Sequence, residues 1–334
     1  MTQKQQESAR KLLCALQDNI RDTLSVARLK AGKSFARIAA VTAADTIYQV
    51  DRIIEEAILR WFEREWPAGW PVEIVMEGVE DGETLTFPRG LAAGKTLYKC
   101  ILDPIDGTRS LMYDKRSAWT LAALAPQRGG DNQIQDILVA TMTELPTSKM
   151  WRSDQFSAVR GGGVKARAFD LRLRQWSPLR VRPAQSDHFE HGFASLARFF
   201  PEGKGILGAM EEELWRKLGL WGKGGGQLVF DDQYLSTGGQ LHGLLAGHDR
   251  MLGDLRPLAY AKLGLGSAAI CCHPYDICTA LILQEAGGVV ETPDGRPLTP
   301  PLNTTSPVAW MGYANPVLAK KVRPVLRRLI GEYF

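Results

Sequence analysis

Cysteine is scarce in this sequence, and the few cysteines present are not arranged for a structural role. There are five, an odd number, and no Cys-X-X-Cys pair occurs. A disulfide-stapled secreted domain needs paired cysteines, and a structural zinc site needs closely spaced ligands. Both classes are therefore disfavoured, and we expect the chain to work in a reducing compartment, the cytoplasm.

Long apolar runs and a strong charge of one sign are also missing. No apolar stretch approaches the roughly 20 residues that span a bilayer. The opening residues, MTQKQQESARK, lack the apolar core of a signal peptide. The net charge is only +4, from 41 basic and 37 acidic residues. We therefore expect a soluble protein that binds neither membrane nor nucleic acid.

What the sequence does contain is an ordinary globular composition over a long chain. Its 334 residues are 45% hydrophobic and 23% charged, which is enough for a sizeable core. Helical and strand patterns alternate throughout, so the class is α/β (α+β), in two halves, 1–185 and 186–334, that form one catalytic unit. Helices are predicted over 5–30, 42–65, 208–218, 229–237, 275–287 and 316–330, and strands over 72–76, 97–102, 119–125, 137–143, 149–152 and 289–291.

Two aspartates follow a buried-looking apolar strand in the stretch CILDPIDGTRS, residues 100–110. The carboxylates of Asp103 and Asp106 would repel each other unless they are protonated or bridged by a cation. Mg²⁺ prefers carboxylate oxygens together with substrate phosphates. Gly107 permits close approach to a ligand, and Thr108 would stand near a helix start, where free amides bind anions. An ordinary turn is the alternative, because Asp-Pro and Asp-Gly are common turn formers.

Two motifs together resemble the inositol monophosphatase family, within the superfamily of lithium-sensitive, Mg²⁺-dependent phosphatases that includes fructose-1,6-bisphosphatases. One is DPIDGT at 103–108, and the other is YDICTALILQEAGG at 275–288. Weaker matches extend the resemblance to about residues 10–330. It implies a layered αβαβα sandwich with the site between the two halves, and a homodimer.

The resemblance also implies a set of metal ligands for two or three Mg²⁺ ions. Asp103 would bridge two metal ions, and Asp106 and Asp276 would complete the second site. Glu77 and the backbone carbonyl of Ile105 would hold the first ion.

Further residues would hold the phosphate and the water. The resemblance implies that the amides of Gly107 and Thr108 bind the phosphate. The Thr108 hydroxyl, hydrogen-bonded to Asp45, would orient and help deprotonate a metal-bound water. The resemblance also implies a catalytic role for Glu77, beside Asp45 and Thr108. It implies that Asp276 contacts the substrate, beside Gly107 and Thr108.

Simpler explanations stay open for some of these residues. Asp276 could be a plain helix N-cap, and Asp45 could be a helix-start acid favoured by the helix dipole. The family usually has Gly-Glu-Glu where this chain has Glu77-Gly78, so a third ion would lack its usual ligand unless Glu80 or Glu83 substitutes. The segment 248–275 is longer than the family's link, which predicts an insertion beside the alcohol portion of the substrate. In it, His248, Asp249 and Arg250 could touch substrate or form a solvated loop.

Together these features predict Mg²⁺-dependent hydrolysis of a small phosphate monoester by a metal-activated water, without a covalent intermediate. The substrate would be an inositol or sugar phosphate, with fructose 1,6-bisphosphate or a 3′-phosphonucleotide as alternatives. A non-catalytic relative that binds a phosphorylated metabolite is a second hypothesis. A third, nucleic-acid binding, rests on the arginines of segment 165–182, whose alternation with apolar residues is more typical of an exposed strand.

Overall fold

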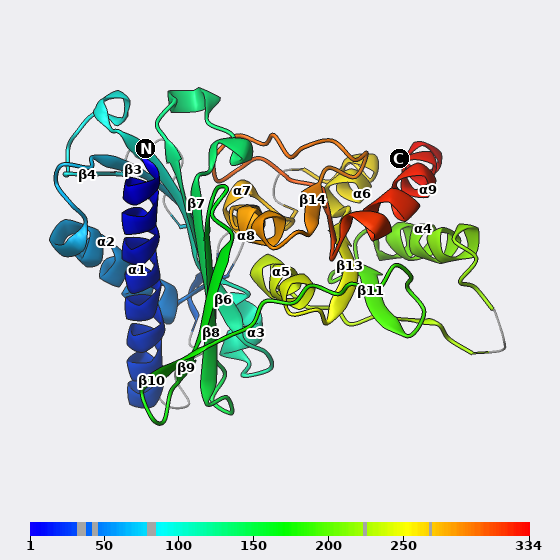
Figure 1. Ribbon diagram of the computed structural model, residues 1–334, viewed down its shortest axis with the longest axis horizontal. Helices are drawn as coiled ribbons and strands as arrows, with labels where there is room; N and C mark the ends of the chain where they lie inside the picture. Colours follow the sequence, from blue (N-terminus) through cyan, green and yellow to red (C-terminus); the bar gives the residue numbers. More distant parts are fainter. Residues whose placement is uncertain (32–37, 42–45, 79–84, 223–225, 267–268) are drawn as a thin grey trace.

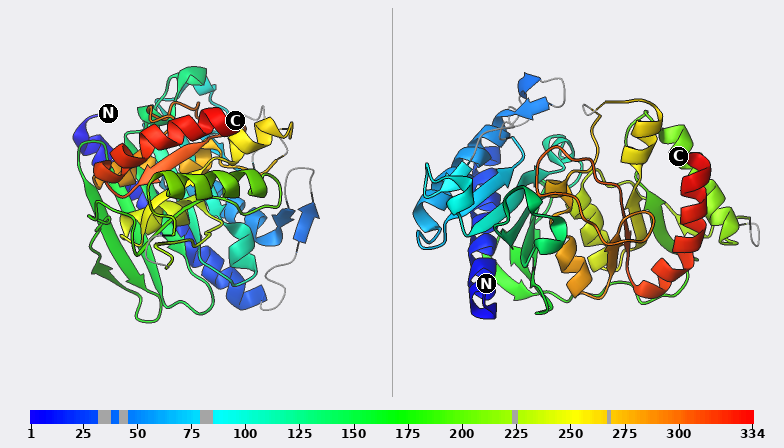
Figure 2. Two further views of the ribbon diagram at one scale, coloured as in Figure 1. Left: turned by 90° about the vertical axis from the view of Figure 1, so that its right-hand side faces the viewer. Right: turned by 90° about the horizontal axis from the view of Figure 1, so that it is seen from above.

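Helices and sheets alternate in five layers (Figure 1). This computed structural model describes residues 1–31, 38–41, 46–78, 85–222, 226–266 and 269–334. The outer layer contains α1 (Gln3–Ala31) and α2 (Gln49–Glu65), and the layer between the sheets contains α5 (Thr237–Leu245), α7 (Pro274–Ile277) and α8 (Ala280–Glu285). Behind the second sheet lie α4 (Lys204–Lys217), α6 (Arg256–Lys262) and α9 (Pro316–Tyr333). The predicted αβαβα sandwich is confirmed, and Figure 2 shows α1 and α9 at opposite ends of the stack.

The first sheet has eight strands in the order β10-β9-β8-β7-β6-β5-β3-β4. All neighbours are antiparallel except β3 and β5. The short helix α3 (Thr108–Met112) follows β5 directly. The strands are β3 (Val72–Met76), β4 (Leu85–Phe87), β5 (Tyr98–Asp106), β6 (Ala118–Pro126), β7 (Val139–Leu145), β8 (Arg152–Val159), β9 (Val164–Asp170) and β10 (Gln175–Pro178).

The second sheet has five strands in the order β12-β11-β13-β15-β14. In it β11 runs parallel to β12 and β13, and β15 pairs antiparallel with β13 and β14. A separate pair is formed by β1 (Ile38–Val41) and β2 (Thr46–Tyr48). The strands of the second sheet are β11 (Gly192–Leu196), β12 (Val229–Phe230), β13 (Asp249–Asp254), β14 (Val289–Glu291) and β15 (Trp310–Tyr313).

Helix α1 lies on the first sheet because one of its faces is apolar at three- and four-residue steps. Leu13, Leu16, Ile20 and Leu24 on this face are buried. Each such side chain contributes about 1.5–3 kcal/mol when fully removed from water. Gln17, in the middle of the same face, donates hydrogen bonds to two carbonyls of β6 and β7, at 3.0 and 2.8 Å. The helix is therefore fixed to the strands that lead to the site. Across the described parts of the chain, no helix is long and apolar enough to cross a bilayer.

The structure differs from the sequence prediction at three helices. Residues 229–237 are not a helix, because the side chains there bond outward to distant residues and Ser236 caps a helix that begins only at Thr237. The predicted helix over 275–287 is two short helices, α7 and α8, with the buried β-branched Thr279 at the break. Helix α2 begins at Gln49, because the residues before it pair with β1 as β2.

Candidate functional site

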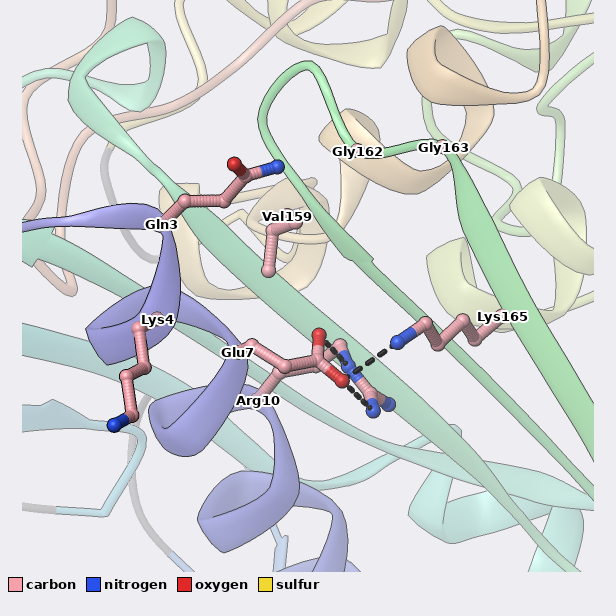
Figure 3. A pocket seen from close by; sticks show the side chains of 8 residues that line it. All are labelled: Gln3, Lys4, Glu7, Arg10, Val159, Gly162, Gly163 and Lys165. Atoms are coloured by element: carbon pink, nitrogen blue, oxygen red, sulfur yellow. Dashed lines mark hydrogen bonds and ion pairs between the residues drawn. The ribbon is translucent and has the colours of Figure 1, made fainter.

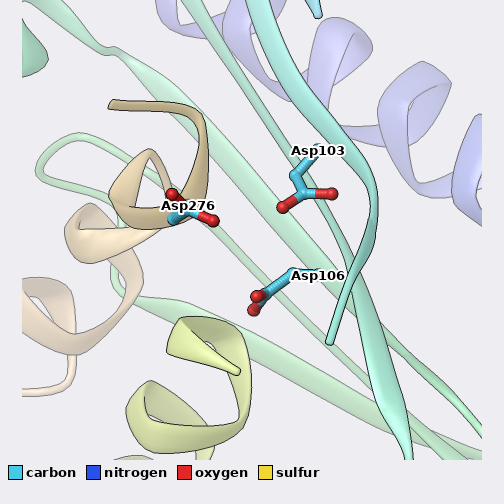
Figure 4. Close-up of side chains that lie close together, drawn as sticks. All are labelled: Asp103, Asp106 and Asp276. Carbon is cyan, nitrogen blue, oxygen red and sulfur yellow. The ribbon is translucent and has the colours of Figure 1, made fainter. Parts of the chain in front are cut away.

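Three carboxylates come together where the first sheet meets the helices of the middle layer. Asp103 and Asp106 lie on β5, and Asp276 lies in α7. One oxygen of each lies within 4.8 Å of the other two, and Figure 4 shows the three side chains converging. Two positions three apart on a regular strand would face opposite sides. The pairing of β5 with β6 is irregular between Asp103 and Asp106, and this bulge places both on one side.

These carboxylates are buried and repel one another. Asp103 is 1% exposed and Asp106 is 6% exposed. Burial raises the pKa of Asp103 well above its usual range, and the charges of Glu77, Asp106 and Asp276 raise it further. Burial, with the charge of Asp276, also raises the pKa of Asp106 to about 7. A cation among them would offset this repulsion, so the donor set fits a divalent metal ion with oxygen ligands.

Glu77 lies at the edge of this cluster. It is half-buried, in the turn that follows β3. Its charge acts on both Asp103 and Tyr275, so it is close enough to belong to the same site. It is not among the three residues whose oxygens share the 4.8 Å group. The structure therefore brings together three of the four predicted acidic ligands and places the fourth beside them.

Asp106 is held by the start of α5. Its carboxylate accepts hydrogen bonds from Ser236 Oγ at 2.7 Å, from Gly238 N at 2.5 Å and from Thr237 N at 3.3 Å. Gly238 is needed for this approach, since a Cβ there would lie 2.8 Å from a methyl carbon of Leu121 and 3.0 Å from Asp106 Oδ2. The acidic strand of one sheet and a helix of the middle layer are thus locked together at the site.

Gly107 makes the turn from β5 into α3. Its φ is +94°, in the left-handed region that favours glycine. A Cβ there would lie 3.0 Å from Ser236 Cβ and 3.1 Å from the Leu235 carbonyl oxygen. Both conformation and space therefore require glycine. The next residue, Thr108, donates its hydroxyl hydrogen to the Ile105 carbonyl at 2.7 Å. Asp45, the predicted partner of Thr108, lies outside the described residues.

Asp276 takes part in a helix cap as well as in the acidic cluster. Its Oδ2 accepts a hydrogen bond from His273 N at 2.6 Å, as the third helical residue of a capping box. The predicted alternative, a plain N-cap, is wrong in its position, because His273 is the N-cap and Asp276 is the third helical residue. Asp276 belongs to both arrangements at once.

Sequence reasoning did not assign two residues that belong to this site. Burial raises the pKa of Tyr275, and the charges of Asp276, Glu77 and Asp103 raise it further, so its phenol stays protonated beside the acids. Ser236, the hydrogen-bond donor to Asp106, is the other. The aromatic-Asp pair and the stretch STGG at 236–239 were visible in the sequence, but neither pattern says which side chain reaches the acids.

The predicted insertion at 248–275 is wrong at its first part. Residues 249–254 form β13, which lies between β11 and β15 in the second sheet. Arg250 donates to the carbonyl oxygens of His188 and Glu190, at 2.9 and 2.8 Å, so it fixes the entry to β11. Its guanidinium is therefore held at a joint of the sheet. Helix α6 then follows the strand.

A pocket between α1 and the β8–β9 hairpin is separate from the acidic cluster and contains none of its residues (Figure 3). At its centre Glu7 accepts hydrogen bonds from Arg10 and Lys165, at 2.7 and 2.6 Å. The bond from Arg10 and the charge of Lys165 lower the pKa of Glu7 to about 2. Arg10 and Lys165 are already paired with Glu7, so these contacts join the helix to the hairpin.

Comparisons with known proteins support the fold. No family model matches the chain, and no curated protein matches it in sequence. The extragenic suppressor protein SuhB from Bartonella henselae is 16% identical, with a TM-score of 0.65 over 96% of this chain and 99% of that one. The Leishmania major fructose-1,6-bisphosphatase is 13% identical, with a TM-score of 0.67 over 95% and 93%. An IMPase from Thermotoga maritima is 15% identical, with a TM-score of 0.59 over 96% and 97%. At these identities the likeness shows the fold.

Proposed function

We propose that this chain, which has the fold shared by inositol monophosphatases and fructose-1,6-bisphosphatases, is a Mg²⁺-dependent phosphatase of a small phosphate monoester. The observation that carries the proposal is the cluster of Asp103, Asp106 and Asp276 from two separate elements of the fold. Holding three carboxylates within 4.8 Å of one another, two of them buried, is unfavourable without a cation. The names of the structural neighbours, an IMPase and a fructose-1,6-bisphosphatase, support the proposed reaction class.

The proposed ligands of two or three Mg²⁺ ions are the three aspartates, Glu77 and the carbonyl of Ile105. Bound divalent ions supply an activated water near neutral pH and offset the charge on the leaving oxygen. The chain's own residues position these groups. Ser236 and the first amides of α5 fix Asp106, and the capping box around α7 fixes Asp276.

The phosphate is proposed to sit at the amides of Gly107 and Thr108. The left-handed turn at Gly107 brings the chain around directly after Asp106, so these amides follow the metal ligands without a break. In the described structure the Thr108 hydroxyl is held by Ile105, and we propose that it turns to Asp45 and the attacking water when substrate is bound. Asp276 would contact the substrate, and attack would be direct, with no covalent phosphoenzyme.

The proposal extends to substrate, assembly and location. An inositol or sugar phosphate is the first substrate choice, and fructose 1,6-bisphosphate or a 3′-phosphonucleotide comes next. The protein would act as a homodimer, supported by the family resemblance. It would work in the cytoplasm, in keeping with the absence of a disulfide among its five cysteines. A non-catalytic binder of a phosphorylated metabolite is the second candidate, favoured by Gly78 in place of the usual second glutamate.

The test is phosphate release from a panel of inositol, sugar and nucleotide phosphates, with and without Mg²⁺. Asp103→Asn removes one carboxylate, and Asp131→Asn, which changes an exposed acid outside the acidic cluster, is the matched control. We expect Mg²⁺-dependent release from at least one compound, lost in Asp103→Asn and kept in Asp131→Asn. Binding of a phosphate ester without release from any compound would instead establish the non-catalytic binder.

A further inference from the structure

Tyr234 lies two residues before Ser236, the residue that donates to Asp106, and its phenol is tied to strand β6. The phenol donates a hydrogen bond to the Ser117 carbonyl oxygen at 2.8 Å and lies 2.8 Å from Ser117 Oγ. It also accepts a hydrogen bond from Trp119 Nε1 at 3.3 Å. One side chain therefore joins the segment that precedes α5 to the beginning of β6.

The strand residue that donates to this phenol is also the neighbour of a proposed metal ligand. Trp119 is the β6 partner of Asp106 in the register of the first sheet. The contacts therefore close a ring. Asp106 pairs with Trp119 in the sheet, Trp119 donates to Tyr234, and two residues later Ser236 returns to Asp106. Movement of the phenol away from β6 would carry the Ser236 hydroxyl away from Asp106.

The segment from Tyr234 to Ser236 has little freedom of its own. Ser236 N donates to the Tyr234 carbonyl oxygen at 2.9 Å, so residues 234–236 form a tight turn. The Tyr234 ring packs against the first turn of α5, since a Cβ at Gly239 would lie 2.4 Å from two of its ring carbons. Phenylalanine would keep this ring contact and lose only the hydroxyl. The contribution of the hydroxyl can therefore be measured separately.

The Ser117 side chain is itself held from the next strand. Its Oγ donates to Glu144 Oε1 at 2.7 Å, and Glu144 is 8% exposed. Glu144 lies on β7 as the register partner of Trp119. Asp106, Trp119 and Glu144 are thus neighbours across three strands, and the hydrogen bonds of Ser117 and Tyr234 connect them from the side of α5. Connected hydrogen bonds of this kind rigidify the groups that they join.

We propose that Tyr234 is a positioning residue of the metal site, whose phenol acts through Ser236 to hold the Asp106 carboxylate in the orientation that binds a divalent ion. The inference rests on the proposed function only in taking Asp106 as a metal ligand. Hydrogen-bond partners of metal ligands typically change metal affinity by roughly 10–100-fold when they are removed. Tyr234 acts one step farther from the ion than Ser236, so its effect should be smaller.

The test is the dissociation constant of Mn²⁺, measured from the electron paramagnetic resonance of the free ion. Mn²⁺ is a suitable probe because it takes the same carboxylate ligands as Mg²⁺. Tyr234→Phe should weaken Mn²⁺ binding by about fivefold. In a Ser236→Ala background the same change should have no further effect. Tyr313→Phe is the control and should leave the constant unchanged, since it removes a buried phenol hydroxyl on β15 that has no hydrogen-bond partner in the described chain.

Two results would overturn the inference alone. One is a loss of stability in Tyr234→Phe with an unchanged Mn²⁺ dissociation constant, which would show a purely structural role. The other is an equal weakening by Tyr234→Phe in wild type and in Ser236→Ala. Absence of Mn²⁺ binding to wild type would overturn the proposed metal site and this inference with it. Phosphate release is measured separately, so a failure of the proposed phosphatase activity would leave these constants and their conclusion intact.

Discussion

Ser236 Oγ donates a hydrogen bond to Asp106 Oδ2 at 2.7 Å, and this contact joins α5 to the acidic strand of the first sheet. The same Ser236 oxygen accepts from Gly239 N at 2.9 Å, as the N-cap of α5. One side chain therefore fixes both a proposed metal ligand and helix α5.

Replacing this serine should lower both the stability of the protein and its rate of phosphate release. Ser236→Ala removes the donor to Asp106 and the helix cap, each of which contributes about 1 kcal/mol to the free energy of unfolding. We expect phosphate release to fall by about tenfold, because Asp106 keeps its length and charge but loses one of its restraints. Ser236→Thr keeps the hydroxyl and should restore most of the activity. Full activity in Ser236→Ala, measured at saturating Mg²⁺, would show that Asp106 does not need this contact.

Gly107 should be intolerant of a methyl group for two separable reasons. Gly107→Ala places a Cβ at a φ of +94° and within 3.1 Å of both Ser236 and Leu235. The backbone strain costs about 1–3 kcal/mol, and overpacking adds a similar amount. Gly161→Ala is the matched control, since its φ is +73° but no atom lies within 4 Å of its Cβ. Denaturant unfolding should show a larger loss for Gly107→Ala. Equal losses in the two variants would mean that the contact with Ser236 is not tight.

Asp103→Asn should stabilise the metal-free protein and abolish its stabilisation by Mg²⁺. In chelator, the carboxylates of the buried Asp103 and Asp106 and the half-buried Asp276 repel one another in wild type, so Asp103→Asn should melt at a higher temperature. The amide oxygen of asparagine can still accept the hydrogen bond that Ile105 N gives to Asp103 at 2.9 Å. Added Mg²⁺ should raise the melting temperature of wild type and leave that of Asp103→Asn nearly unchanged. Thermal scans with and without Mg²⁺ check this, and an equal shift in both proteins would speak against Asp103 as a ligand.

Asp249 should make stability fall as pH rises. Its pKa is about 7 in the folded protein against an ordinary value of 3.8, so the folded state holds a proton that the unfolded chain releases. Stability is therefore lost as pH rises from about 4 to about 7. Asp249→Asn removes this pH dependence. From pH 4.5 to pH 8 we therefore expect its free energy of unfolding to rise, relative to that of wild type, by on the order of 1 kcal/mol. Denaturant unfolding at both pH values measures the gain, and Asp131→Asn should show none.

The acidic site could largely be predicted from the sequence, since its signals are local. The stretch at 103–108 combines two acids, a proline and a glycine, and the resemblance supplied Asp276 from a distant segment. The hydrogen bond between Ser236 and Asp106 could not be predicted, because it joins residues 130 positions apart. Only the packing of α5 against β6 brings them together.

The errors in the predicted elements have the same origin. The stretch 229–237 has acids and apolar residues at helical spacing, yet Asp231 bonds to Arg198 and Gln233 bonds to Leu196, at the end of β11 and just beyond it. Asp249 was expected in a solvated loop or against substrate, and it lies at the start of a strand inside the second sheet. In both places, contacts with residues distant in the sequence override the local propensity, and a local sequence pattern cannot predict such contacts.

The most direct test of the central claim is the rate of phosphate release, as Mg²⁺ is added to chelator-treated wild type and to Asp103→Asn, with the best phosphate ester from the panel. The account predicts no release before Mg²⁺ is added, a saturable rise in wild type, and no rise in Asp103→Asn. Release that is independent of Mg²⁺, or an equal rise in both proteins, would contradict the claim that these buried aspartates hold the ions of a phosphatase.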